Sequence, residues 1–212
     1  MLRRIGDELK HHVPFTALGS VTGILLMLIV VLAKVPSSFS TAAFDALHPL
    51  HVVLGAIVTT SMYKKHTNPK IWMAILVGYT GAVGIATLSD ALIPYLGGAL
   101  LGVEMEFHVP FIDTARVPGL GIETWLLVNL AALTGILIGY WRPTTKLPHA
   151  GHILVSTLAS LFYFTAFGVA QWLPLLPLIF VFLFLAVWIP CCTSDIVFPL
   201  LFVRSKLPPQ EV

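Results

Sequence analysis

The chain has 212 residues, of which 57% are hydrophobic and only 10% are charged, and its formal net charge is +2. A soluble domain carries about a quarter charged residues, so this composition excludes a soluble globular protein and predicts an integral membrane protein whose first partner is the lipid bilayer. The small net charge excludes a nucleic-acid partner, and two adjacent cysteines, Cys191 and Cys192, argue against a disulfide framework.

Six apolar segments are long enough to cross a bilayer, which takes roughly 20 residues of helix. In chain order, we predict spans over 14–35, 47–63, 70–97, 119–141, 149–172 and 174–203. An all-α fold is favoured because lipid offers the backbone no hydrogen-bond partner, and the sequence lacks the short alternating segments of a barrel. Pro94 and Pro190 predict a break or kink in the third and sixth spans.

Lysine and arginine are unevenly distributed between the two ends of these spans. If the N-terminus is inside, ten of the 12 lie in inner segments and only Lys34 and Arg116 lie in outer ones. Positive charge gathers on the cytoplasmic side of membrane proteins. The sequence therefore predicts a multi-pass protein of the plasma membrane with both termini cytoplasmic.

Short motifs recur in the same order in the two halves of the chain. The pairs are HVPF at 12–15 and 108–111, H-x-x-H at 48–51 and 149–152, S-D-x-x-x-P at 89–94 and 194–199, and TGIL at 22–25 and 134–137. We predict an internal duplication with repeats over 1–100 and 101–212. Each repeat holds three spans, and because three is odd the second repeat is inverted, as in many secondary transporters.

The repeated motifs place histidines and an aspartate together near each face of the membrane. The predicted outer set is His48, His51, Asp90 and His108. The predicted inner set is His12, His149, His152 and Asp195, with His11, Cys191 and Cys192 as additional candidate ligands. Histidines three residues apart share one face of a helix. Imidazole together with carboxylate suits a divalent cation such as Zn²⁺ or Fe²⁺, so we expect a metal at each set.

Each of these residues also has a reading without function. A histidine at the start of a span can sit at the headgroup interface, and a cysteine in an apolar helix is often a small apolar residue. An aspartate can end a helix at the interface, which the proline four residues after Asp90 and after Asp195 would favour. Against this, a charge inside an apolar span costs about 2.5–3.5 kcal/mol on insertion scales and by default indicates function.

Three functions fit the pattern. The first, which we favour and which is not enzymatic, is a secondary transporter of a divalent transition-metal cation with one His/Asp site near each membrane face. The second is a b-type cytochrome with two haem b groups near opposite leaflets, which leaves the repeated S-D-x-x-x-P without a role. The third is a membrane-embedded metal hydrolase, for which one site suffices and which lacks the glutamate of H-E-x-x-H. The sequence neither requires nor excludes a homo-oligomer.

Overall fold

The computed structural model describes residues 2–117, 119–144 and 146–203, with the side chains of 2–12, 15, 16, 146–150 and 192 left outside the description. The long unbroken helices are α1 (Leu2–Leu32), α2 (Ser37–His66), α6 (Thr124–Trp141), α7 (Lys146–Phe167) and α8 (Trp172–Cys192). Shorter pieces form one further long segment: α3 (Ile71–Tyr79), η1 (Thr80–Gly84), α4 (Ile85–Thr87), η2 (Leu88–Leu92) and α5 (Ile93–Leu100). Helix α8 is extended by η3 (Thr193–Val197) and α9 (Phe198–Leu201). The η elements are π-helical turns.

Among the described residues, four helical segments are long and apolar enough to cross a membrane: Ser37–His66, Ile71–Leu100, Thr124–Trp141 and Trp172–Leu201. Two shorter apolar stretches, Ala17–Leu32 and Gly151–Phe167, belong to α1 and α7. The prediction of an all-α membrane protein is confirmed at this level, with four candidate crossings. Six crossings arranged as a 3+3 repeat stay a prediction.

The outward face of α1 shows why this chain suits lipid. Large apolar side chains are exposed along one stripe of the helix, at Leu18, Val21, Leu25, Ile29 and Leu32. Their spacing of three or four residues keeps them on a single helical face. In water such a continuous apolar stripe would be a liability, whereas in hydrocarbon it is the expected surface.

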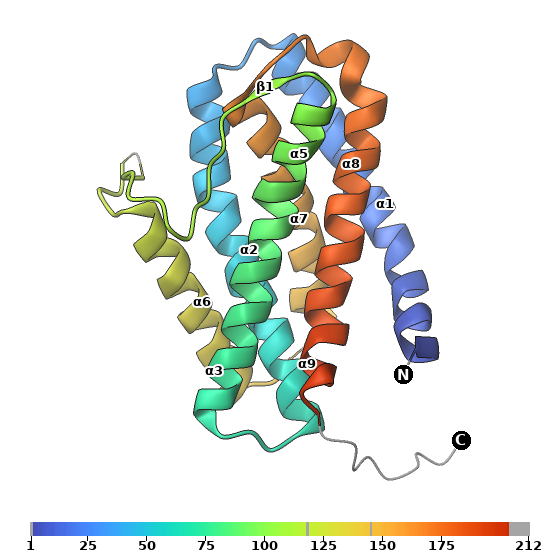
Figure 1. The fold of residues 1–212 in the computed structure, drawn as a ribbon, viewed down its shortest axis with the longest axis vertical. Coiled ribbons are helices and arrows are strands. Elements are labelled where there is room, and N and C mark those ends of the chain that lie inside the picture. The colour runs from blue at the N-terminus through green and yellow to red at the C-terminus, as the bar shows by residue number, and fades with distance from the viewer. Residues whose placement is uncertain (1, 118, 145, 204–212) are drawn as a thin grey trace.

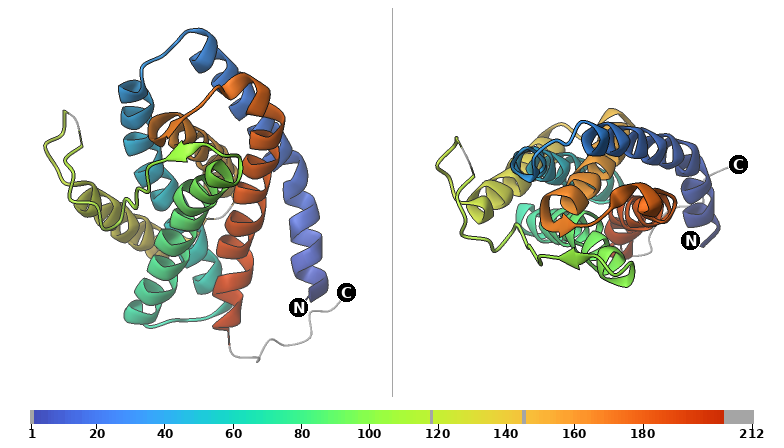
Figure 2. Two further views of the ribbon diagram at one scale, coloured as in Figure 1. Left: turned by 45° about the horizontal axis from the view of Figure 1, so that its top comes forward. Right: turned by 90° about the horizontal axis from the view of Figure 1, so that it is seen from above.

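The helices pack around a central pair, α2 and α7 (Figure 1). Helix α6 lies on one side of this pair and packs on α2 and α3, and α1 lies on the other side and packs on α7 and α8 (Figure 2). The strands β1 (Glu104–Met105) and β2 (Gly168–Val169) form a small antiparallel pair at one end. We call this the strand end. The opposite end, where α1 begins and α9 ends, is the terminal end (Figure 1).

Two glycines let α6 approach α2 closely. A Cβ atom at Gly135 would collide with the carbonyl oxygen of Val53, and one at Gly139 would lie 2.6 Å from that of Ile57. Glycines four residues apart present one flat face, which allows two helix backbones to come into contact. This close contact fixes the position of α2, and therefore of the side chains that α2 carries into the centre.

The helices continue through both copies of the motif S-D-x-x-x-P, and α8 continues through Pro190, so neither Pro94 nor Pro190 ends its helical segment. Each copy instead forms a π turn, η2 or η3, and the chain continues as helix beyond it. In a π turn each N–H bonds to the carbonyl five residues back. Pro94 and Pro199 have no N–H, so the carbonyls of Ser89 and Ser194 lose this donor. Both carbonyls therefore need partners from elsewhere.

The contact between α6 and α2 gives a first prediction. Gly135→Val should lower the free energy of unfolding by about 1–3 kcal/mol, because the added atoms meet backbone that cannot move aside. Thermal unfolding in detergent should show the loss as a lower Tm. Gly84→Ala is the matched control, since a Cβ there would meet nothing within 4 Å. A Gly135→Val protein that melts with the wild type would contradict the close packing.

Candidate metal centre

The H-x-x-H motif of α2 lies deep in the helix. Helix α2 has 30 residues and begins at Ser37, ten residues before the predicted start of this span. His48 is therefore about 16 Å along a helix about 45 Å long, at 1.5 Å per residue. The prediction that His48 and His51 lie at the outer start of their span is wrong. Both imidazoles are fully buried near the middle of the bundle.

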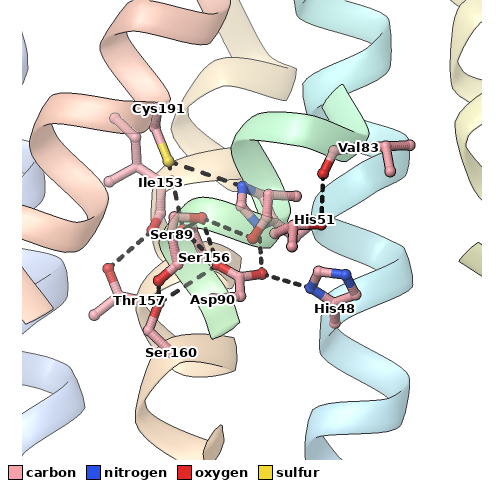
Figure 3. A network of polar contacts seen from close by, with 12 residues as sticks. His48, His51, Val83, Ser89, Asp90, Ile153, Ser156, Thr157, Ser160 and Cys191 are labelled. Atoms are coloured by element: carbon pink, nitrogen blue, oxygen red, sulfur yellow. Dashed lines mark hydrogen bonds and ion pairs between the residues drawn. The ribbon is translucent and has the colours of Figure 1, made fainter. Parts of the chain in front are cut away.

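Asp90 joins these two histidines. Its Oδ2 atom accepts hydrogen bonds from Nδ1 of His48 at 2.9 Å and from Nδ1 of His51 at 2.5 Å (Figure 3). All three side chains are buried. The π turn η2 carries Asp90 on the face that looks toward α2 and α7, so the motif that the sequence flagged as polar is directed into the protein and away from lipid.

The second oxygen of Asp90 is also occupied. Its Oδ1 atom accepts from the hydroxyls of Ser89 at 2.7 Å, Ser156 at 3.1 Å and Ser160 at 3.4 Å. A carboxylate in an apolar setting is stabilised when such donors replace water. Five polar groups thus surround one carboxylate, with the hydroxyl of Ser160 sharing its single proton with the carbonyl of Ser89. Asp90 acts as the acceptor that fixes the two imidazoles.

The second half of the chain repeats part of this arrangement. Nδ1 of His152 donates to Oδ2 of Asp195 at 2.8 Å, and both side chains are buried. Asp195 sits in the π turn η3, as Asp90 sits in η2. The other histidine of this motif, His149, lies outside the described side chains, as do His11, His12 and Cys192.

The two histidine sets meet. The rings of His51 and His152 are 4.4 Å apart between centroids, so these sites are not separated toward opposite faces as the sequence suggested. The reason is that α2 and α7 cross where both motifs lie. Gly55 makes the contact feasible, because a Cβ there would lie 3.3 Å from Nε2 of His152.

Cys191 completes the group. Its Sγ atom lies 3.8 Å from Nε2 of His51, and one ligand atom from each of His51, His152 and Cys191 falls within 4.8 Å of the others. His48, His51 and Asp90 form a second such group that shares His51. Both groups are fully buried and could hold a metal ion. We call His48, His51, Asp90, His152, Cys191 and Asp195 the central cluster.

Two hydroxyls that the sequence analysis missed supply the bonds that the prolines remove. Ser160 donates to the carbonyl of Ser89 at 2.9 Å, and Thr59 donates to that of Ser194 at 3.3 Å. Thr59 and Ser160 each stand eight residues after the second histidine of their motif. Extending the repeat by two further helical turns would have revealed this pair.

His108, predicted in the outer set, does not reach Asp90. Its Nδ1 lies 3.3 Å from Oδ2 of Asp113, and its ring stacks on Phe167 at 4.5 Å between centroids. Burial lowers the pKa of His108 below that of free histidine, against the opposing effect of Asp113, so the ring is neutral near pH 7. Asp113 is therefore a partner of His108.

The hydroxyls of Ser160 and Thr59, which donate to the carbonyls of Ser89 and Ser194, give a second prediction. Ser160→Ala and Thr59→Ala should each lower the free energy of unfolding by about 1–3 kcal/mol, because each leaves a buried carbonyl without a donor. Thr134→Ala is the control, since that hydroxyl is exposed and bonds only to Leu130 of its own helix. The measurement is thermal unfolding of purified protein. Equal melting of all three variants would show that the two hydroxyls do not carry this role.

Comparison of the chain with known protein families, curated proteins and solved structures found no match. The central cluster is thus the feature from which a function can be inferred.

Proposed function

We propose that the protein is a secondary transporter of a divalent transition-metal cation, which binds at the central cluster as the transported substrate. The observation that carries this proposal is the buried group of His51, His152 and Cys191, contributed by three different helices. Transporter sites of this kind lie near the middle of the membrane, between the moving halves of the protein. The burial of the central cluster between α2, α7 and α8 supports such a placement.

The hydrogen bonds of the two histidines suit metal binding. Because Nδ1 of His51 donates to Asp90, its Nε2 atom, which lies 3.8 Å from Sγ of Cys191, is the ring nitrogen that would bind a cation. Nδ1 of His152 donates to Asp195 in the same way. A histidine that binds a metal almost always donates its other nitrogen to a carboxylate or carbonyl in this way. The aspartates then orient the ligands instead of coordinating the ion themselves.

The carboxylates of the central cluster also support a divalent cation as the transported substrate. A divalent cation that leaves water for an apolar interior needs negative charge close by. Asp90 and Asp195 supply two such charges within hydrogen-bond distance of the histidine ligands. Imidazoles without these carboxylates would leave the ion uncompensated.

For the architecture, we propose six crossings arranged as an inverted 3+3 repeat over 1–100 and 101–212. Support comes from the exchange of contacts between the halves: α1 packs on α7 and α8, and α6 packs on α2 and α3. Thr59 of the first half serves the π turn of the second, and Ser160 of the second half serves that of the first. Such reciprocity is expected of two related halves joined by a two-fold axis.

For the orientation, we propose that the terminal end faces the cytoplasm at the plasma membrane. The links over 67–70 and 142–144 lie at this end, together with the start of α1 (Figure 1). Ten of the 12 lysines and arginines belong to the segments expected there. The excess of positive charge on one side is the signal that usually sets orientation.

The two alternatives fit less well. A haem b held between two histidines needs room for its macrocycle between the rings, whereas those of His51 and His152 are 4.4 Å apart. A hydrolase needs a base that can take a proton from water, whereas both oxygens of Asp90 already accept hydrogen bonds from protein donors.

Labelling of introduced cysteines tests the crossing by α7. Val169→Cys at the strand end should react with an impermeant maleimide added outside cells, and Thr144→Cys should react only after permeabilisation. Both positions are exposed, so lack of reaction would reflect the membrane and not burial. Ser38→Cys serves as a second marker for the strand end. Reaction of positions 144 and 169 from the same side would refute the crossing.

Metal flux in proteoliposomes tests the transporter itself. Asp90→Asn and Asp195→Asn should each reduce Zn²⁺ uptake by about 10–100-fold, because asparagine removes the charge and misdirects the histidine that it holds. The double variant should be hardly worse, since both residues act on one centre. Asp45→Asn is the matched control, because Asp45 is a buried aspartate of α2 outside the central cluster. Wild-type uptake by both single variants would end the proposal.

A further inference from the structure

We infer that the central cluster selects thiophilic divalent cations, Zn²⁺ and Cd²⁺, over Mn²⁺ and Fe²⁺, with Cys191 as the residue that determines this specificity. The inference rests on the proposed transport function and narrows its substrate. Three features of the cluster support this inference. The oxygens of Asp90 are already hydrogen-bonded, the thiol of Cys191 lies beside His51, and the two halves of the chain differ in the residues that meet there.

The carboxylate of Asp90, an oxygen ligand of the kind that harder cations need, is already engaged by protein donors. Oδ2 of Asp90 is held by two imidazoles and Oδ1 by three serine hydroxyls. Coordination of an ion by Asp90 would break several of these buried hydrogen bonds at once, each of which is costly to lose. Carboxylate and water oxygens suit Mn²⁺, so the engagement of Asp90 removes one ligand that Mn²⁺ would prefer.

The ligand that the cluster offers in place of a carboxylate is the sulfur of Cys191. Cys191 is fully buried, with its Sγ atom 3.8 Å from Nε2 of His51 and 3.4 Å from Oγ of Ser156. A cation that binds here meets two imidazole nitrogens and one sulfur. Cysteine binds a metal as the thiolate, with release of its proton to the solvent. Nitrogen and sulfur ligands favour Zn²⁺ and softer ions, and tetrahedral Zn²⁺ sites commonly combine histidine with cysteine.

The two halves differ at this point. In the first repeat, Ala86 precedes Asp90 by four residues, as Cys191 precedes Asp195, so the thiol has a methyl group as its counterpart. Gly55 and Ser156 likewise each follow the second histidine of their motif by four residues. Gly55 leaves room for the ring of His152, and Ser156 contacts both Cys191 and Asp90. Of the two groups that could hold a metal, only that of His51, His152 and Cys191 therefore contains a sulfur ligand.

Binding of Cd²⁺ to purified protein in detergent tests the thiol directly, because Cd²⁺ bound to thiolate absorbs in the ultraviolet by charge transfer. The wild type should show this band, Zn²⁺ should abolish it by competition, and Mn²⁺ should do so only at far higher concentration. Cys191→Ser should remove the band and weaken Zn²⁺ binding about tenfold or more while changing Mn²⁺ binding little. Cys192→Ser, which removes the neighbouring thiol, should retain the band.

Gly55→Val keeps the inference testable if Cys191→Ser fails to fold. Its side chain would displace His152, so Zn²⁺ binding should fall while the Cd²⁺–thiolate band persists. Gly151→Ala on α7 is the control, since a Cβ there would make only ordinary contact with Leu54 at 3.4 Å.

The outcomes separate the two proposals. A band that survives in Cys191→Ser or disappears in Cys192→Ser overturns the assignment of Cys191. Equal competition by Mn²⁺ and Zn²⁺ overturns the selectivity, even where metal uptake into proteoliposomes is robust. The expected band and preference without any metal uptake would uphold the site and its selectivity and refute transport.

Discussion

The structure is organised around one carboxylate in an apolar interior. Asp90 can be buried there only because every acceptor position on its two oxygens meets a donor from a neighbouring helix or from its own turn. This requirement brings η2 into contact with α2 and α7 and fixes the rings of His48 and His51. The close contact of α6 with α2 through Gly135 and Gly139 helps to fix the position of α2, and therefore of these two rings.

The π turns provide the second constraint. A proline four residues after an aspartate would normally expose a carbonyl to hydrocarbon, where no water can bind it. Here the exposed carbonyl belongs to the serine that precedes the aspartate, and a hydroxyl from the opposite half covers it. The same few residues therefore position the carboxylate, change the backbone hydrogen bonds from the α to the π pattern, and form hydrogen bonds between the two halves of the chain. This is why the motif recurs as a unit of serine, aspartate and proline.

Much of this arrangement could be predicted from the sequence, and the failures have identifiable causes. The apolar runs predicted where helices lie, and the order of the motifs predicted that Asp90 would serve the histidines of α2. The depth of His48 was missed because Asp45 and Pro49 resemble the start of a helix, whereas α2 continues for two turns and more before them. The meeting of His51 with His152 depends on where two helices cross, and Gly55, which permits it, carries no chemical signal in a single sequence.

The packing of α1 on α7 and α8 has a consequence for how the chain is made. Helix α1 is synthesised before α7 and α8, the helices that it contacts. Until they arrive, the small face around Gly19 and Gly23, which later receives Thr157, has only lipid beside it. The reverse holds for α6, because α2 and α3, on which it packs, are synthesised before it. Helix α1 can therefore dock only after α7 and α8 have been made, onto helices from the other half of the chain.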